Sequence, residues 1–187
     1  MVRSRAAART FEWGNLMATR RVVTGHTPEG HATVASDRPI GAMELGTGGV
    51  TFEVVWARDD TAHFPDDGAV PEVAGAFPPP GGCGFGITVI PPGTDSDMQR
   101  YIRDNLPDLA DPDEPGMHRT ATLDFEYIVE GTLTLELDDG VEVELGPGDV
   151  VVQNGTRHRW SNRGDKPVKF LAFNVGATHD ITGGRPV

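Results

Sequence analysis

Short runs of β-branched and apolar residues, separated by turn-forming residues, fill the second half of this 187-residue chain. The strands expected there cover residues 129–137, 141–145, 150–153, 157–161 and 168–175. Between the first two lies Asp138-Asp139-Gly140, a sequence that predicts a hairpin turn. Many short strands at even spacing, with turn residues between them, are typical of a sandwich or a barrel. The sequence therefore predicts one all-β domain.

Two of the β-rich segments carry a histidine each, and together they hold most of the functional information. His118 lies in residues 117–131, and His158 lies in residues 148–162. Side chains on a strand alternate between its faces, so Asp124 and Glu126, at even spacing from His118, look into the same space. If both segments face one cavity, imidazoles and carboxylates meet there. Such a set of side chains can form a metal site or an acid–base site.

The chain divides into four expected segments. Residues 1–18 are predicted to be a disordered basic extension, and residues 177–187 a flexible tail. Residues 19–84 are predicted to supply N-terminal strands at 21–24, 31–35 and 50–57 and a long flap that packs on the barrel. The flap is rich in proline, glycine and aspartate, which is typical of a surface connection. The barrel itself is expected over residues 85–176, with a strand at 85–90 and one short helix over 96–106, capped by Ser96 and stopped by Pro107.

The two histidine segments resemble the two motifs of the cupin superfamily, whose members are double-stranded β-helix (jelly-roll) barrels. In the first motif, a histidine pair is followed by a carboxylate and then a glycine; His118, Asp124 and Gly131 match this spacing. In the second motif, a glycine precedes a short strand, a turn, a histidine and an asparagine; Gly148, His158 and Asn162 match it. The resemblance covers about residues 85–175. It implies a jelly-roll barrel with one short helix, and a homodimer formed by strand exchange.

Two departures from the motifs bear on a metal site. Thr120 stands where the first motif has its second histidine, and Asp124 replaces the usual glutamate. The resemblance implies that a divalent metal, zinc or iron, is held by His118, Asp124 and His158, since two histidines and one carboxylate suit either ion. The alternative is a family member that has lost its metal, in which both histidines fill the cavity or form hydrogen bonds there.

Glu126 is the side chain that points most directly to chemistry. A carboxylate inside a largely apolar barrel has a raised pKa unless it is paired, which makes it a candidate acid or base near neutral pH. We therefore expect Glu126, His118 and His158 to be the catalytic residues. The alternative is that Glu126 turns outward, or pairs with Arg119 or Arg157.

Three further residues are expected to line the substrate pocket: Thr120, Trp160 and Gln153. Trp160 lies two residues after His158, hence on the same face, and an indole is well suited to stack on a planar substrate. Neighbouring residues at odd spacing should face away from the cavity. On this basis Phe125 and Tyr127 are expected in the core between sheets, and Arg157 and Arg159 are expected to point away from the cavity.

Composition excludes several partners. The net charge of −12 argues against nucleic acid and against an anionic membrane surface, because both require clustered positive charge. No apolar run approaches membrane-spanning length. Cys83 is the single cysteine, so no internal disulfide can form and a reducing cytoplasm is the expected location.

Three functions remain open at this point. The first is a small-molecule enzyme with metal-dependent lyase chemistry: dehydration, decarboxylation or cyclisation of a keto or aromatic, polyketide-like acid. This interpretation rests on a resemblance to accessory cupin enzymes of secondary metabolism. The second is an Fe(II)-dependent dioxygenase using the same ligands. The third is a non-catalytic barrel that binds a small molecule, which the missing histidine favours.

Overall fold

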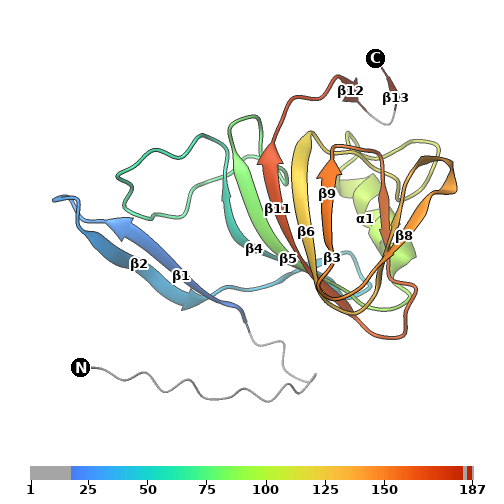
Figure 1. Ribbon diagram of the computed structural model, residues 1–187, viewed down its shortest axis with the longest axis horizontal. Coiled ribbons are helices and arrows are strands. Elements are labelled where there is room, and N and C mark those ends of the chain that lie inside the picture. Colours follow the sequence, from blue (N-terminus) through green and yellow to red (C-terminus); the bar gives the residue numbers. More distant parts are fainter. Residues whose placement is uncertain (1–17, 183–184, 187) are drawn as a thin grey trace.

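The computed structural model describes residues 18–182 and 185–186, so nearly all of the extension expected over residues 1–18 lies outside the described residues. Figure 1 shows a β-rich molecule with one short helix at the edge of the barrel. The first strands are β1 (Arg20–His26), β2 (Ala32–Pro39), β3 (Met43–Leu45), β4 (Val50–Arg58) and β5 (Cys83–Ile90), followed by the helix α1 (Asp95–Asn105). The barrel continues with β6 (Thr122–Glu130), β7 (Leu133–Glu136), a 3-10 turn at Asp138–Gly140, β8 (Glu142–Leu145), β9 (Val150–Asn154), β10 (Arg159–Ser161) and β11 (Val168–Gly176). The short strands β12 (Ile181–Thr182) and β13 (Arg185–Pro186) follow.

Two antiparallel sheets enclose the barrel. The larger has six strands in the order β3-β4-β5-β11-β6-β9, and the smaller has three in the order β10-β7-β8. Buried side chains from both sheets form one core, with Val50, Ile128 and Phe170 from the larger sheet and Leu133, Leu135 and Leu145 from the smaller. Burial of this apolar surface is the main force that holds the two sheets together. The all-β jelly-roll expected from the sequence is confirmed.

The strand β6 determines what faces the cavity. It pairs with β11 on one side and β9 on the other, so that Asp124 lies opposite Asn174 and Gln153. Asp124, Glu126 and Ile128 are buried, whereas Phe125 and Tyr127 alternate with them on the outer face, where 38% and 45% of their surface is exposed. The alternation predicted from the sequence is therefore present. The prediction that Phe125 and Tyr127 belong to the core was wrong, because this face of the larger sheet has no second layer over them among the described residues.

The strand expected over residues 129–137 is interrupted. β6 ends at Glu130 and β7 begins at Leu133, with Gly131 at φ 79° between them. A Cβ at position 131 would lie 2.5 Å from the carbonyl oxygen of Pro167, too close for any side chain. The backbone turns from the larger sheet into the smaller one at this glycine. The expected hairpin after β7 is present, since β7 pairs with β8 around the 3-10 turn.

The helix α1 begins one residue earlier than expected. Its N-cap is Thr94, not Ser96, and the Thr94 hydroxyl donates to the carbonyl of Pro91 instead of capping a helical N–H. Asp95 and Asp97 in the first turn interact favourably with the positive end of the helix dipole. Ile102 is buried and anchors the helix to the barrel. The described part of the chain has no helix of the length and apolarity needed to cross a membrane.

The N-terminal hairpin of β1 and β2 extends away from the barrel (Figure 1). It contacts β4 through Arg21, whose guanidinium donates to the carbonyl of Val55 at 3.1 Å. It also contacts the flap, which we define as residues 59–82, because the His26 N–H donates to the carbonyl of Asp66 at 2.7 Å. The flap has no regular strand or helix, and part of it covers the mouth of the barrel.

Candidate functional site

A cavity of about 470 Å³ lies inside the barrel, and most of its wall is apolar. Its aromatic lining comes from several parts of the chain: Phe52 and Trp56 of β4, Phe77 of the flap, Phe85 of β5, Tyr101 of α1, Trp160 of β10 and Phe170 of β11. α1 closes part of the mouth with Met98 and Ile102. The polar side chains gather on β6 and on the two histidine segments. A cavity of this size suits a small organic molecule.

A chain of hydrogen bonds fixes Asp124 at the polar part of the cavity. The Asn174 amide donates to Oδ1 of Asp124 at 2.7 Å, and the Thr120 hydroxyl donates to Oδ2 at 3.3 Å. Thr122 in turn donates to the Thr120 hydroxyl at 2.8 Å. Burial raises the pKa of Asp124, and the bonds from Asn174, Thr122 and Thr120 lower it. These donors stabilise the ionised form of a carboxylate that is only 3% exposed.

The two histidines predicted to share a cavity do so. His118 and His158 exchange two backbone hydrogen bonds of 2.9 Å, and their ring centroids are 4.3 Å apart. Nδ1 of His118 lies 3.0 Å from the Gly116 carbonyl, and Nδ1 of His158 lies 2.8 Å from the Thr156 carbonyl. A carbonyl can only accept, so each ring carries its proton on Nδ1 and its lone pair on Nε2. Burial lowers the pKa of both rings, that of His158 to about 3, and both are neutral at pH 7.

Glu126 faces the cavity and does not turn outward. It is 4% exposed, and among the described residues its Oε2 atom has no hydrogen-bond partner. Burial, followed by the negative charge of Asp124, raises the pKa of Glu126 to about 8. Glu126 is therefore mostly protonated at neutral pH, while the neighbouring Asp124 has donors that favour its ionised form. Burial raises the pKa of both carboxyl groups, and side-chain hydrogen bonds oppose the rise at Asp124. Two buried carboxyl groups in unequal environments are typical of acid–base sites.

The predicted metal ligands do not gather as a three-ligand set. His118 and His158 each offer an unprotonated Nε2, which suits a metal ion. The oxygens of Asp124, however, accept bonds from Asn174 and Thr120. No group of three or more histidine, cysteine, aspartate or glutamate side chains in the described part of the chain has a geometry that could hold an ion. Metal binding by His118, Asp124 and His158 stays a prediction, and no step below depends on it.

Of the three predicted pocket residues, two line the cavity. Thr120 lies beside Asp124, and Trp160 makes an edge contact with the His158 ring at 5.5 Å. Gln153 is buried but does not line the cavity; its amide donates to the carbonyl and the hydroxyl of Thr156, which places it behind the turn that leads to His158. Arg159 was expected to point away, yet it forms part of the cavity wall.

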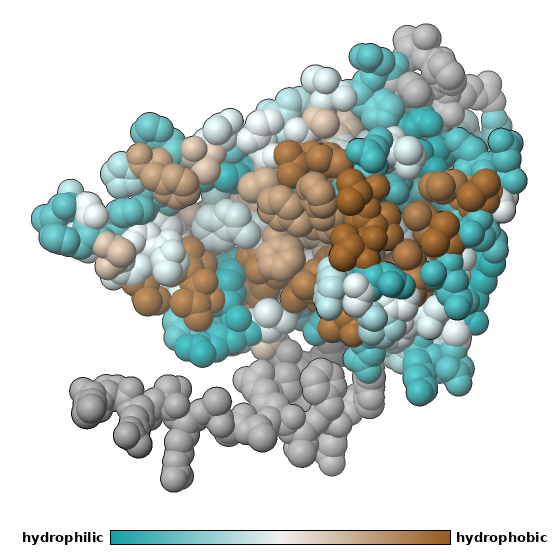
Figure 2. Space-filling view, viewed as in Figure 1, coloured by the Kyte–Doolittle hydropathy of each residue, from teal (hydrophilic) through white to brown (hydrophobic). Residues whose placement is uncertain are grey.

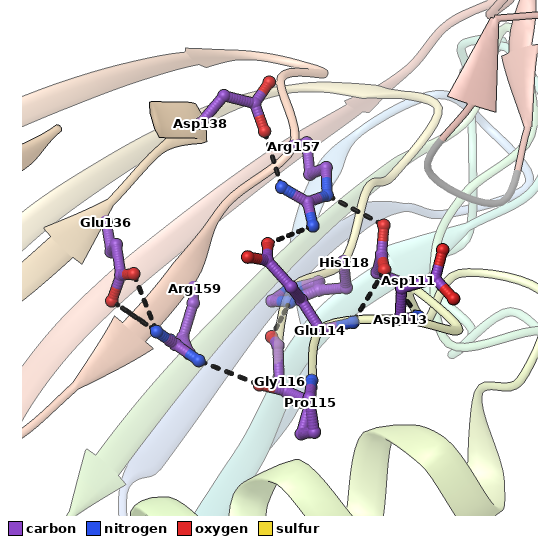
Figure 3. A network of polar contacts seen from close by, with 10 residues as sticks. All are labelled: Asp111, Asp113, Glu114, Pro115, Gly116, His118, Glu136, Asp138, Arg157 and Arg159. Carbon is purple, nitrogen blue, oxygen red and sulfur yellow. Dashed lines mark hydrogen bonds and ion pairs between the residues drawn. The ribbon is translucent and has the colours of Figure 1, made fainter. Parts of the chain in front are cut away.

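Two arginines that flank His158 hold the acidic loop, which we define as residues 108–116. Figure 3 shows Arg157 between Asp111 and Glu114 of this loop and Asp138 of the turn after β7, with Nε 2.9 Å from Asp111. Arg159 donates to the Pro115 carbonyl at 2.9 Å and to both oxygens of Glu136. The same loop supplies the Gly116 carbonyl that accepts from His118. The two arginines therefore position His118 through the acidic loop.

Sequence reasoning missed several residues of the site. Asn174 on β11, the donor to Asp124, lies outside both motifs. Phe52 and Trp56 lie on β4, about sixty residues before the first motif, and Phe77 lies in the flap. Alternation along β11 could have assigned Asn174 to the same face as Phe170 and Ala172. Which strand lies beside β6 could not be read from the sequence.

Replacement of Glu126 by glutamine should change stability in a pH-dependent way. The Glu126 carboxyl has a pKa of about 8 in the folded protein, whereas in the unfolded chain it ionises above its ordinary pKa of 4.5. The unfolded chain therefore binds fewer protons between these values, so this group makes the free energy of unfolding fall as pH rises. The melting temperature of E126Q, relative to wild type, should increase from pH 5 to pH 8. Glu130→Gln, on the same strand but outside the cavity lining, is the control, and an E126Q difference that stays constant with pH contradicts the buried, protonated state.

Replacement of Arg157 by methionine should loosen the acidic loop. The substitution keeps an apolar stem but leaves the Asp111 carboxylate, whose side chain is 8% exposed, without its cationic partner. We expect a loss of about 1–3 kcal/mol in the free energy of unfolding, the cost of leaving a buried polar group poorly paired. Hydrogen–deuterium exchange should be faster at residues 108–118. Arg163→Met, which removes an exposed arginine paired with Glu142, is the matched control, and equal effects of the two substitutions would rule out a special role of Arg157.

Comparison with known proteins finds similarity in the part of the chain that forms the barrel. The family model described as the cupin domain matches residues 110–174. Oryzines biosynthesis cluster protein J of Aspergillus oryzae is 49% identical over 49 residues, which cover 26% of this chain and 27% of that protein. The cupin-domain-containing oxidoreductase fogC of Aspergillus ruber is 40% identical over 57 residues, which cover 30% and 28%. The match thus spans only about a quarter of the length of these curated relatives.

Among solved structures, the cupin domain of Cnp3 from Schizosaccharomyces pombe aligns with a TM-score of 0.48 and 8% identity, covering 84% of this chain and 87% of that one. A predicted oxalate decarboxylase from Thermotoga maritima aligns with a TM-score of 0.41 and 18% identity, covering 73% and 90%. The family match includes His118, Asp124 and His158, and the strands around them close the expected jelly-roll. Similarity to the cupin superfamily is thus shown for residues 110–174, the part of the barrel that holds both histidines.

Proposed function

We propose that this cupin is a small-molecule enzyme that carries out acid–base chemistry on an aromatic or polyketide-like keto compound. One observation carries the proposal: Glu126, with its pKa raised to about 8, presents an oxygen without a partner to a largely apolar cavity. A group whose pKa lies near the working pH is an efficient proton donor and acceptor. Dehydration, decarboxylation and cyclisation all need such a proton transfer at a carbonyl, hydroxyl or carbon.

In the proposed mechanism Glu126 is the proton donor. The apolar wall and Trp160 hold the planar body of the substrate, and the substrate's carbonyl or leaving hydroxyl lies against Glu126. The neutral His118 and His158 rings accept hydrogen bonds at Nε2 from substrate hydroxyl groups. Asp124 accepts hydrogen bonds from Asn174 and Thr120 that favour its ionised form, and its charge adds to the burial that raises the pKa of Glu126. The apolar surroundings exclude water and strengthen each of these interactions.

The relatives support a role in secondary metabolism. Several of these relatives are named after biosynthesis clusters, including the oryzines cluster of Aspergillus oryzae and the phomopsin cluster of Diaporthe leptostromiformis. The aromatic cavity lining is consistent with products of that kind. A cavity filled by side chains, or an exposed Glu126, would have favoured a non-catalytic barrel, and neither feature occurs among the described residues.

A second candidate is an iron-dependent oxidoreductase, such as a dioxygenase. It is favoured by the names of relatives called cupin-domain-containing oxidoreductases and by the two unprotonated imidazole nitrogens. This candidate needs a third ligand beyond His118 and His158. Oxygen uptake by iron-loaded protein during turnover would favour it over the lyase.

Glu126→Gln should slow proton transfer to a planar ketone. In deuterated buffer the wild-type protein should catalyse exchange of the α-protons of 2-tetralone, followed by NMR, with Glu126 donating a proton to the carbonyl oxygen and an unprotonated histidine Nε2 accepting the α-proton. Loss of the acid should slow exchange about 100-fold. Because Glu126 acts in its protonated form, the wild-type rate should fall as pH rises through about 8. Glu130→Gln should exchange at the wild-type rate. A rate that E126Q leaves unchanged would remove Glu126 from the mechanism.

We also propose that the chain forms a homodimer through the outer face of the larger sheet. Exposed apolar side chains gather there on three neighbouring strands: Phe125, Tyr127, Val150, Val152 and Phe173. Figure 2 shows hydrophobic residues collected over this face. A two-fold interface places the same patch on both sides, and an uncharged apolar patch is complementary to itself. In a chain of net charge −12, a charged surface would instead repel its copy.

Val152→Glu should convert the dimer to a monomer. A carboxylate buried between two copies of the patch would lose its hydration without gaining a partner, which is costly. Light scattering after size exclusion gives the mass directly. Val143→Glu, at a valine of the smaller sheet that is 42% exposed against 52% for Val152, should leave the mass unchanged. A wild-type protein that is already monomeric at high concentration would contradict the proposal.

A further inference from the structure

The charges around the cavity are strongly unbalanced. Three carboxyl groups line it: Asp95 at the start of α1, Asp124 and Glu126. The single cationic side chain among the described lining residues is Arg159. All of the Arg159 nitrogens are engaged, with Nε and Nη2 on the Glu136 carboxylate and Nη1 on the Pro115 carbonyl. Arg159 is therefore neutralised by Glu136, and most of its five N–H groups are already used, which leaves at most the second N–H of Nη1 for a ligand.

The uncharged polar groups do not replace the missing cation. The Asn174 amide and the Thr120 hydroxyl both donate to Asp124. The imidazoles of His118 and His158 donate from Nδ1 to backbone carbonyls, which leaves acceptor nitrogens at Nε2. Around Asp124 and Glu126 the polar groups thus offer mainly acceptors, and among the described residues Oε2 of Glu126 is a buried polar atom without a partner. The other donors of the lining are uncharged and do not replace a cation; they belong to Trp56, Thr88, Gln99, Tyr101 and Trp160.

An anionic ligand would meet a large cost here. A carboxylate that leaves water must be paired with a cation or several N–H donors, or it loses several kcal/mol of hydration without compensation. Asp124 would add direct repulsion, which is strong in a cavity of low dielectric constant. A hydroxyl group has neither problem, because it donates to an acceptor such as Oε2 of Glu126 and carries no charge. A cationic ligand would gain less binding free energy than the number of carboxyl groups suggests, because Asp124 already accepts two hydrogen bonds.

We infer that the cavity binds planar, largely apolar molecules through an uncharged hydroxyl or enol group placed at Glu126, and that it discriminates against carboxylates. This inference rests on the proposed function for the identity of the site, and it narrows the aromatic or polyketide-like keto compounds to those without a carboxylate: phenols, enols and their keto forms. The carboxyl groups of the cavity wall act as a charge filter. Discrimination of this kind needs no additional contact, since it comes from desolvation of the rejected ligand.

The test compares ligands of nearly equal size by isothermal titration calorimetry at pH 7.5. We expect metal-free protein to bind 2-naphthol at least about tenfold more tightly than 2-naphthoate, a factor that corresponds to about 1.4 kcal/mol. The same order should hold after addition of Zn(II). Equal or tighter binding of 2-naphthoate in either condition overturns the inference, as does the absence of 2-naphthol binding. Tighter binding of cationic 2-(aminomethyl)naphthalene than of 2-naphthol also overturns it.

A matched pair of variants identifies the source of the discrimination. Asp124→Asn removes a charge from the cavity wall and should raise 2-naphthoate affinity several-fold relative to 2-naphthol. Asp139→Asn removes the same charge from the exposed turn after β7 and should leave the ratio of affinities unchanged. An unchanged ratio in D124N would show that cavity charge does not select the ligand. Selective 2-naphthol binding without any tetralone exchange would overturn the proposed reaction and leave this inference standing.

Discussion

The pairing of β6 with β11 is the constraint on which the site depends. Their register sets Asp124 opposite Asn174 and Glu126 opposite Ala172, with all four residues on the cavity side. A slip of one residue would turn Phe125 and Tyr127 inward and expose both carboxylates. Ile128 on the same face is fully buried in the core, so the apolar packing that closes the barrel also fixes the position of the carboxylates.

The register of β6 and β11 places two carboxyl groups, Asp124 and Glu126, close together inside the folded barrel, which is unfavourable. Two carboxyl groups two residues apart on one strand cannot both ionise easily when buried, and the protein resolves the conflict by unequal hydrogen bonding. Asp124 receives donors from Asn174 and Thr120, whereas Oε2 of Glu126 receives none from the described residues. The apolar core between the two sheets, and the bonds of Arg157 and Arg159 to the acidic loop, stabilise the fold enough to offset this cost. Buried groups that are poorly satisfied are typical of sites where function opposes stability.

The sequence predicted the parts of the site that depend on spacing along one strand. Alternation placed Asp124 and Glu126 on one face, and the resemblance brought His118 and His158 together. Asn174 and Trp56 could not be predicted, because their positions depend on which strands become neighbours. Phe125 and Tyr127 were assigned to the wrong environment because alternation gives a face but does not say whether another layer covers it. Gly131 matched the motif, yet its role in ending β6 required knowledge of the close approach of Pro167.

Thr120 shows how one substitution can change the chemistry of a cupin barrel. A histidine at this position would bring a third imidazole to the cavity, whereas the threonine hydroxyl accepts from Thr122 and donates to Asp124. Asp124 is then part of a hydrogen-bonded chain that runs along β6, and its oxygens are less available to an ion. Burial, together with the charge of this carboxylate, raises the pKa of its neighbour Glu126. Replacement of one imidazole by a hydroxyl thus changes both the donors around Asp124 and the set of possible metal ligands at the cavity.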